Sequence, residues 1–139
     1  MTDRTSLVKA GAPYTGHRRI NVLENTIDYS ANNAGASDTD RYITIPAGSY
    51  VIGLVAIVDT LEGGTMTFEV GDSDAATTFL TGANGNSGTY KMGDGGDGTT
   101  VTTTVSKLYD AADYILVTVN NAADTMKLTI RLMVVDIAA

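Results

Sequence analysis

Residues 126–136 read MKLTIRLMVVD, and this stretch decides the fold class. Apolar side chains recur at every second position, which places them on one face of an extended strand. They are Met126, Leu128, Ile130, Leu132 and Val134. Lys127, Thr129 and Arg131 alternate with them and lie on the opposite face. The pattern predicts a β-strand that turns one face toward a hydrophobic core.

Shorter β-prone stretches recur along the chain between clusters of Gly, Asn, Asp and Ser. Residues 65–70 (TMTFEV) alternate cleanly, whereas residues 50–58 are apolar on both faces, as in a strand covered on both sides. We expect about six or seven strands in all. The others lie at residues 41–45, 77–80, 99–105 and 114–119, with further strand candidates at 20–23 and 26–29.

The absence of sustained helical periodicity favours an all-β fold, an antiparallel β-sandwich of jelly-roll type. We expect neighbouring runs joined by short turns to pair with each other. Residues 82–88 and 93–98 have loop compositions, and residues 109–113 form a helical turn or a tight corner. Residues 1–19 are predicted to be an extended basic N-terminal arm, and residues 20–139 the sandwich domain.

Charge is distributed unevenly along the chain. Residues 1–20 hold four bases and one acid, a balance of +3, whereas residues 46–139 hold four bases and eleven acids, a balance of −7. An acidic body repels phosphate, so we expect no nucleic-acid partner. The longest apolar run, residues 50–58, is far shorter than the ~20 residues of a spanning helix, so we expect no membrane partner.

The residue inventory argues against an enzyme. The chain has no Cys, which excludes thiol catalysis and thiolate metal sites, and it has a single histidine, His17, inside the predicted arm. A general base needs an oriented partner, which an extended terminus does not supply. No cofactor is expected. A hydrolase that uses two carboxylates remains a weaker alternative, because nothing selects two of the sixteen acids.

Two features have competing interpretations. Asp72 and Asp74 have a spacing that can share a hard cation, but Asp and Gly are also ordinary turn formers. The mean hydropathy of +0.04 is high for a small acidic chain. The excess apolar surface fits either a subunit interface or a well-filled core.

Four segments resemble small structural proteins of tailed bacteriophages, of the capsid decoration or cement type. They are IPAGSYVIGL (residues 45–54), EGGTMTFEVGD (62–72), KLYDAADYI (107–115) and VVD (134–136). The resemblance covers roughly residues 26–136 and leaves the arm outside it. Its motifs belong to turns and strands and carry no catalytic residue.

The resemblance implies a non-enzymatic β-sandwich subunit, often a trimer, that binds the major capsid protein on the outer surface of the virion and clamps neighbouring shell subunits. We expect the arm to dock on an acidic groove of the shell, through Arg4, Lys9, His17, Arg18 and Arg19. The alternatives are a solvated tail for the arm, and a head-fibre or receptor- or carbohydrate-binding β-module for the whole chain. The absence of Trp argues against sugar binding.

Overall fold

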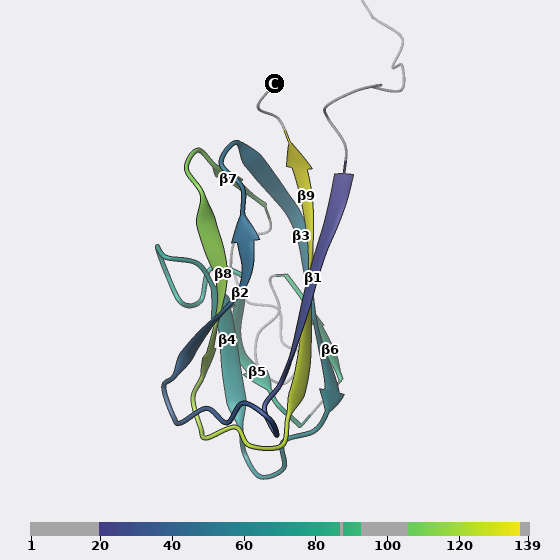
Figure 1. The fold of residues 1–139 in the computed structure, drawn as a ribbon, viewed down its shortest axis with the longest axis vertical. Helices are drawn as coiled ribbons and strands as arrows, with labels where there is room; N and C mark the ends of the chain where they lie inside the picture. Colours follow the sequence, from purple (N-terminus) through teal and green to yellow (C-terminus); the bar gives the residue numbers. More distant parts are fainter. Residues whose placement is uncertain (1–19, 87, 93–105, 137–139) are drawn as a thin grey trace, which may run out of the picture.

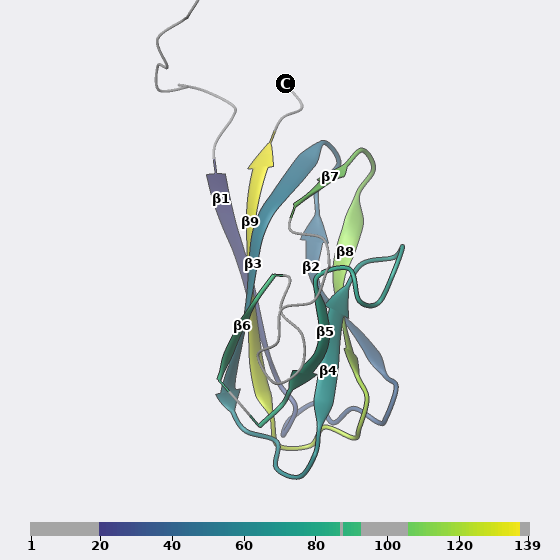
Figure 2. The same cartoon turned by 180° about the vertical axis from the view of Figure 1, so that it is seen from behind.

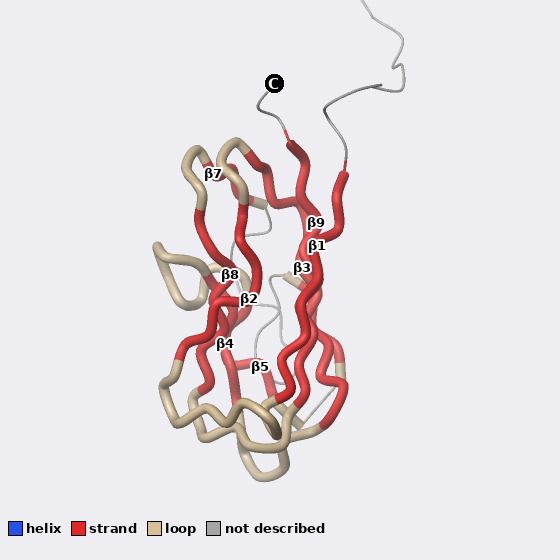
Figure 3. Tube along the Cα trace, in the orientation of Figure 1, coloured by secondary structure: helices blue, strands red, loops and turns tan. Residues whose placement is uncertain are grey.

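A computed structural model describes residues 20–86, 88–92 and 106–136, and all regular structure in these ranges is β-strand (Figure 3). The strands are β1 (Ile20–Asp28), β2 (Thr39–Ile45), β3 (Ser49–Thr60), β4 (Thr67–Gly71), β5 (Leu80–Asn84), β6 (Thr89–Lys91), β7 (Lys107–Tyr109), β8 (Asp113–Val119) and β9 (Lys127–Asp136). No helix long and apolar enough to cross a membrane occurs within the described ranges.

The strands form two sheets that face each other (Figures 1 and 2). One sheet, which we call sheet A, has the order β1-β9-β3-β6, with β7 beside β6 on the same edge of β3; the other, sheet C, has the order β2-β8-β4-β5. Every pairing is antiparallel. The described strands thus form two facing antiparallel sheets, which confirms the predicted all-β antiparallel sandwich. The predicted arm, residues 1–19, lies outside the described residues.

The expectation that neighbouring strands pair with each other is wrong for most of the chain. The turn at residues 46–48 carries the chain from β2 in sheet C to β3 in sheet A, and residues 61–66 carry it back to β4. Among consecutive strands only β4 and β5 pair. These connections cross from one layer of the sandwich to the other.

Several strand boundaries also differ from the prediction. Residues 20–28 form one continuous strand, held by nine register pairs to β9. Residues 77–79 are not a strand, and the predicted loop at 82–88 begins inside β5, where pairing with β4 outweighs the loop composition. Residues 109–113 form a tight corner between β7 and β8. The predicted strand 99–105 and loop 93–98 lie outside the described residues.

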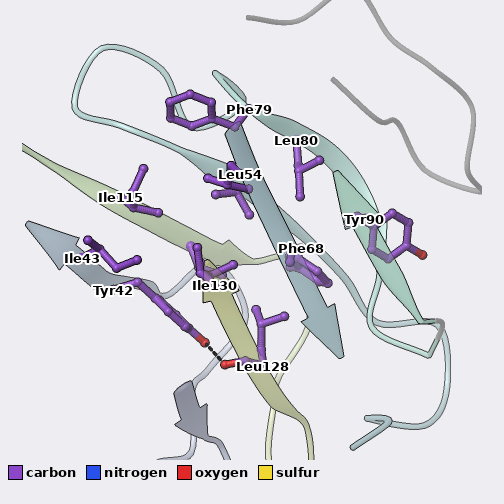
Figure 4. Packing of buried hydrophobic residues seen from close by; sticks show 14 of the residues in the cluster. Tyr42, Ile43, Leu54, Phe68, Phe79, Leu80, Tyr90, Ile115, Leu128 and Ile130 are labelled. Carbon is purple, nitrogen blue, oxygen red and sulfur yellow. Dashed lines mark hydrogen bonds between the residues drawn. The ribbon is translucent and has the colours of Figure 1, made fainter. Parts of the chain in front are cut away.

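The core lies between the two sheets (Figure 4), and β1 adds to it only the partly buried Leu23 and Ile27. From β9 it takes the predicted Leu128, Ile130, Leu132 and Val134. Opposite them lie Phe68 and Val70 of β4 and Ile115, Val117 and Val119 of β8, all fully buried. The alternation predicted for residues 65–70 and 126–136 is therefore confirmed.

A β-bulge in β3 decides which of the apolar residues 50–58 face the core. The register with β9 shifts between Val51 and Gly53, which changes the set of residues that point inward. Val51 is buried before the bulge, and Leu54, Ala56 and Val58 are buried after it. The side chains between them lie on the outer face, where Val55 and Ile57 are half-buried.

Two buried tyrosines are joined by a hydrogen bond between their hydroxyl groups within this core. The Tyr42 hydroxyl donates to the Tyr29 hydroxyl at 3.2 Å and lies 3.4 Å from the Leu128 carbonyl oxygen, the contact drawn in Figure 4. The Tyr29 hydroxyl donates to Asp40 at 3.1 Å. Burial is the main cause that raises the pKa of both phenols far above the usual value of about 10. Both groups therefore stay protonated and serve as polar connections inside the sandwich.

Candidate functional site

The densest group of polar side chains is built around Asp72, directly after β4. Asp72 is 2% exposed, and its Oδ1 accepts hydrogen bonds from the backbone N–H groups of Asp74 (3.0 Å) and Ala75 (3.2 Å) and from the Thr78 hydroxyl (2.9 Å). This arrangement is an Asx-type turn, in which a carboxylate organises the backbone that follows it. The alternative that reads Asp72 as a turn former is therefore confirmed.

The second carboxylate oxygen of Asp72 reaches across to sheet A. Its Oδ2 accepts from the Tyr109 hydroxyl at 2.6 Å and forms an ion pair with Lys107 Nζ at 2.7 Å. Lys107 and Tyr109 are the two ends of β7, and their side chains point to the same side of that strand. We call Asp72, Asp74, Lys107 and Tyr109 the clamp, because they join β7 to the turn after β4.

The clamp fixes the charge state of its members. Burial acts to raise the pKa of Asp72, but hydrogen bonds from Lys107, Tyr109, Thr78 and Ala75 outweigh it, so the pKa lies below its usual value. Burial acts to lower the pKa of Lys107, and the carboxylates of Asp72 and Asp74 outweigh it and raise the pKa. Burial, followed by the contact with Asp72, raises the pKa of Tyr109. All three groups keep their ordinary charges at neutral pH.

This geometry answers the question of a cation site at Asp72 and Asp74. Lys107 Nζ lies 2.7 Å from an oxygen of each carboxylate, so the ammonium group takes the place that a shared metal ion would take. No group of three or more His, Asp or Glu residues within the described ranges is arranged to hold a metal ion. Asp72 is also a poor general acid, since that role needs a raised pKa.

The outer face of sheet A is the second candidate surface. The strand register aligns Ile20 of β1 with Val135, Tyr50 and Leu108 in one row across the sheet. Two residues along β1, Val22 lies beside Met133, which covers Gly53. The next row holds charges at both sides of the sheet, Glu24 on β1 and Lys91 on β6, with Arg131 and Val55 between them. We call these three rows the sheet A face.

The apolar side chains of the sheet A face are unusually exposed. Ile20 is 64% exposed, Val22 59%, Leu108 44% and Ile52 37%. These are four of the six large exposed apolar residues of the described chain, and they gather on one face. A grouped apolar surface on a small protein is typical of a contact site.

The outer face of sheet C is different in character. Thr39 and Thr118 share a hydrogen bond of 3.0 Å there, and the Arg41 guanidinium covers the ring of Tyr114 at 4.5 Å. Polar groups thus dominate this face, and its exposed aromatic ring is partly screened by a charged neighbour. The contrast singles out the sheet A face as the apolar surface.

The predicted contact residues Arg4, Lys9, His17, Arg18 and Arg19 lie outside the described residues, so their role stays a prediction. The chain enters the described part at Ile20, on the sheet A face. The apolar periodicity of the sequence indicates the two-faced run at 50–58 but not the exposed positions Ile20, Val22 and Leu108. The sequence identifies these residues as apolar but does not show that they lie on an outer face. Which face of a strand points outward depends on the strands that pack against it.

Neither known protein families nor curated proteins match the sequence. Solved structures do match along almost the whole chain. A chain of the cyanophage Pam1 capsid asymmetric unit is similar with a TM-score of 0.62 and 17% identity over 96% of both chains. A chain of the capsid of Ralstonia phage GP4 is similar with a TM-score of 0.65 and 12% identity, over 94% of this chain and 93% of that one.

A chain in the acid-stable capsid structure of Helicobacter pylori bacteriophage KHP30 is similar with a TM-score of 0.56 and 10% identity, over 86% of this chain and 90% of that one. At such low identity the likeness is one of fold. The protein thus shares its sandwich, over nearly its full length, with chains found in three phage capsid structures.

Proposed function

We propose that this protein is a bacteriophage capsid decoration protein, or cement protein, which binds the outer surface of the shell and clamps neighbouring subunits of the major capsid protein. The observation that carries the proposal is the likeness in fold, over 86% to 96% of this chain, to chains of three phage capsid structures. The sequence motifs at residues 45–54, 62–72, 107–115 and 134–136 point the same way independently.

A non-enzymatic role agrees with the chemistry of the described residues. The most organised polar group, the clamp, has its carboxylate Asp72 fully engaged and its charges paired. Such a group stiffens a scaffold and leaves no acid or base poised for proton transfer. The proposed protein needs a rigid sandwich and adhesive surfaces, with no cofactor and no nucleic acid.

Binding to the shell would stabilise it by linkage, because a ligand that binds only the assembled state shifts the equilibrium toward assembly.

We propose that the protein acts as a trimer, with residues 1–19 as an arm joined to a sandwich domain of residues 20–139. The net charge of +3 on residues 1–19 supports the arm as a contact with an acidic groove of the shell. Arg4, Lys9, His17, Arg18 and Arg19 are the proposed contacts with the shell.

Co-sedimentation with undecorated shells of the same virus tests the function. We expect the full chain to pellet with the shells and to raise their melting temperature. Free protein that ignores the shells and binds a glycan array would overturn the proposal in favour of a fibre or carbohydrate-binding module.

The arm is tested by Arg18→Gln combined with Arg19→Gln. We expect weaker shell binding and a shallower dependence of binding on salt, since two cations are lost. The matched control is Arg41→Gln with Lys127→Gln, which removes the same charge from the exposed sandwich surface and leaves binding close to that of the unaltered protein. If the two double variants weaken shell binding equally, the arm is a solvated tail that does not contact the shell.

A further inference from the structure

A groove lies at the end of the sandwich where β1 begins. Figure 1 shows the start of β1, the end of β9 and the turn between β2 and β3 together at this end. The groove has a volume of about 260 Å³, and its lining includes Asn21 and Leu23 of β1, Val134 and Asp136 of β9, and Pro46 and Ser49 on either side of the β2–β3 turn. Among these six residues only Asp136 carries a charge.

The Asp136 carboxylate has no partner for its charge in the described part of the chain. The residue is partly buried at the end of β9, and no hydrogen bond or ion pair of its carboxylate occurs within residues 20–86, 88–92 and 106–136. By contrast, Asp72 and Glu24 each form an ion pair with a base of their own chain. A carboxylate that has lost part of its water is stabilised by a nearby cation, so the groove favours a basic occupant.

The strand register places Arg19 opposite this carboxylate. β1 and β9 pair so that Ile20 faces Val135, and Asp136 is the next residue along β9, with Ser49 of β3 on its other side. The position across from Asp136 on the β1 side therefore belongs to Arg19. Because consecutive Cα atoms lie about 3.8 Å apart, the peptide bond to Ile20 keeps Arg19 at the rim of the groove.

The alternation of side chains separates Arg19 from its neighbour Arg18. Asn21 and Leu23 line the groove, and a strand that continues backward from them turns Arg19 to the same face. Arg18 then shares the outer face of the sheet with Ile20. Two adjacent arginines of the arm thus have different surroundings.

We infer that the groove is the docking site of Arg19, the last residue of the N-terminal arm, and that its guanidinium pairs with the Asp136 carboxylate in the free chain. Residues 137–139 also adjoin the groove, but their sequence, IAA, contains no base. A second copy or the shell would have to bring its cation from solution, whereas the chain itself holds Arg19 at a local concentration in the millimolar range or above. The inference goes beyond the proposed function, since it concerns the free chain, and it adds that groove and shell compete for Arg19.

Trypsin cleavage after Arg19 tests the pairing on the free full-length chain. We expect Asp136→Asn to speed the release of the fragment that starts at Ile20 by about two- to fivefold, the effect of losing one partly exposed ion pair. Asp110→Asn is the matched control, because it removes the same charge from the exposed β7–β8 corner at the same end of the sandwich, and it should leave the rate unchanged.

Two results of this assay would overturn the inference. One is an equal rate for the unaltered chain and Asp136→Asn, or an equal acceleration by Asp136→Asn and Asp110→Asn. The other is a difference that appears only when shells are added, because the groove would then take its cation from the shell.

A disulfide tests the register. The unaltered chain has no Cys, so Arg19→Cys with Asp136→Cys places two thiols alone in the protein. Residues directly opposite in an antiparallel pair have Cα atoms about 4.5–5.5 Å apart, within the range of a disulfide. We expect an intramolecular bond on a denaturing, non-reducing gel, formed about tenfold faster than in Arg18→Cys with Asp136→Cys, whose side chains lie on opposite faces.

Similar rates for the two cysteine pairs, or bonds that form only between chains, would overturn the inference. Neither the disulfide assay nor the cleavage of the free chain depends on binding to a shell. A failure of the proposed function therefore leaves these results unchanged, and the two failures can be told apart.

Discussion

Lys107 Nζ lies 2.7 Å from Asp72 Oδ2, and this ion pair joins β7 of sheet A to the turn that follows β4 of sheet C. The Asp72 side chain is fully buried, whereas a quarter of the Lys107 side chain remains exposed. In this ion pair the Asp72 carboxylate is shielded from water, whereas the Lys107 side chain keeps partial access to water. It connects the two layers of the sandwich at the edge where β7 pairs with only three residues of β3.

We expect Asp72→Asn to destabilise the fold by about 2–3 kcal/mol. This is near the lower end of the cost of removing one partner of a buried ion pair, because the partly exposed Lys107 can regain contact with water. That loss corresponds to a fall of about 6–12 °C in the thermal unfolding midpoint. Asp74→Asn is the control, since Asp74 binds the same Lys107 at 2.7 Å but is 74% exposed. It should cost less than about 1 kcal/mol. Equal losses for the two variants would contradict a buried clamp.

The clamp should also impose a pH dependence on stability. The pKa of Asp72 is lower in the folded state than in the unfolded state, so its stabilisation is present above about pH 3.9 and is lost as the pH falls through the folded pKa. The pKa of Lys107 is raised, so its contribution is present below about pH 10.4 and is lost as the pH rises through the folded pKa.

Urea unfolding at a series of pH values measures this effect. The difference in unfolding free energy between the unaltered chain and Asp72→Asn should be constant around neutrality and shrink below about pH 4. A difference that grows on acidification would show that the folded pKa of Asp72 is raised instead.

Spectroscopic titration should separate the buried phenols from the others. Tyr29, Tyr42 and Tyr109 have raised pKa values, chiefly because of burial, so we expect them to stay protonated at pH 10, where a free phenol ionises. Their absorbance change should appear only with alkaline unfolding. Tyr29→Phe should leave the first phase unchanged and reduce the second. A reduced first phase would place Tyr29 among the accessible phenols.

Two glycines should respond differently to the same substitution. A Cβ on Gly71 would meet the backbone of Ala75 and Ala76, which cannot move without breaking the turn around Asp72. We expect Gly71→Ala to destabilise the fold by about 2–3 kcal/mol. A Cβ on Gly53 would meet only the terminal methyl group of Met133, which can rotate away, so Gly53→Ala should cost less than about 1 kcal/mol. Chemical denaturation of both variants gives the comparison, and a larger loss for Gly53→Ala would contradict it.

The sequence by itself determined the fold class and the faces of its clearest strands. Alternation in residues 65–70 and 126–136 identified the side chains that fill the core, because a strand exposes opposite faces at successive residues whatever its neighbours are. The turn role of Asp72 was one of two alternatives that the sequence offered, since an Asp side chain forms turns through local hydrogen bonds to the backbone. These features depend on residues close together in the chain.

Tertiary structure alone decided the strand partners and both candidate surfaces. Nothing local to β1 indicates that it pairs with β9, more than 100 residues away, or that β2 and β3 lie in opposite sheets. The meeting of Asp72 with Lys107, and of Ile20 with the row that ends in Leu108, follows from those long-range pairings. Which sheet a strand joins depends on the burial gained from the whole sandwich, and no short stretch of sequence contains that information.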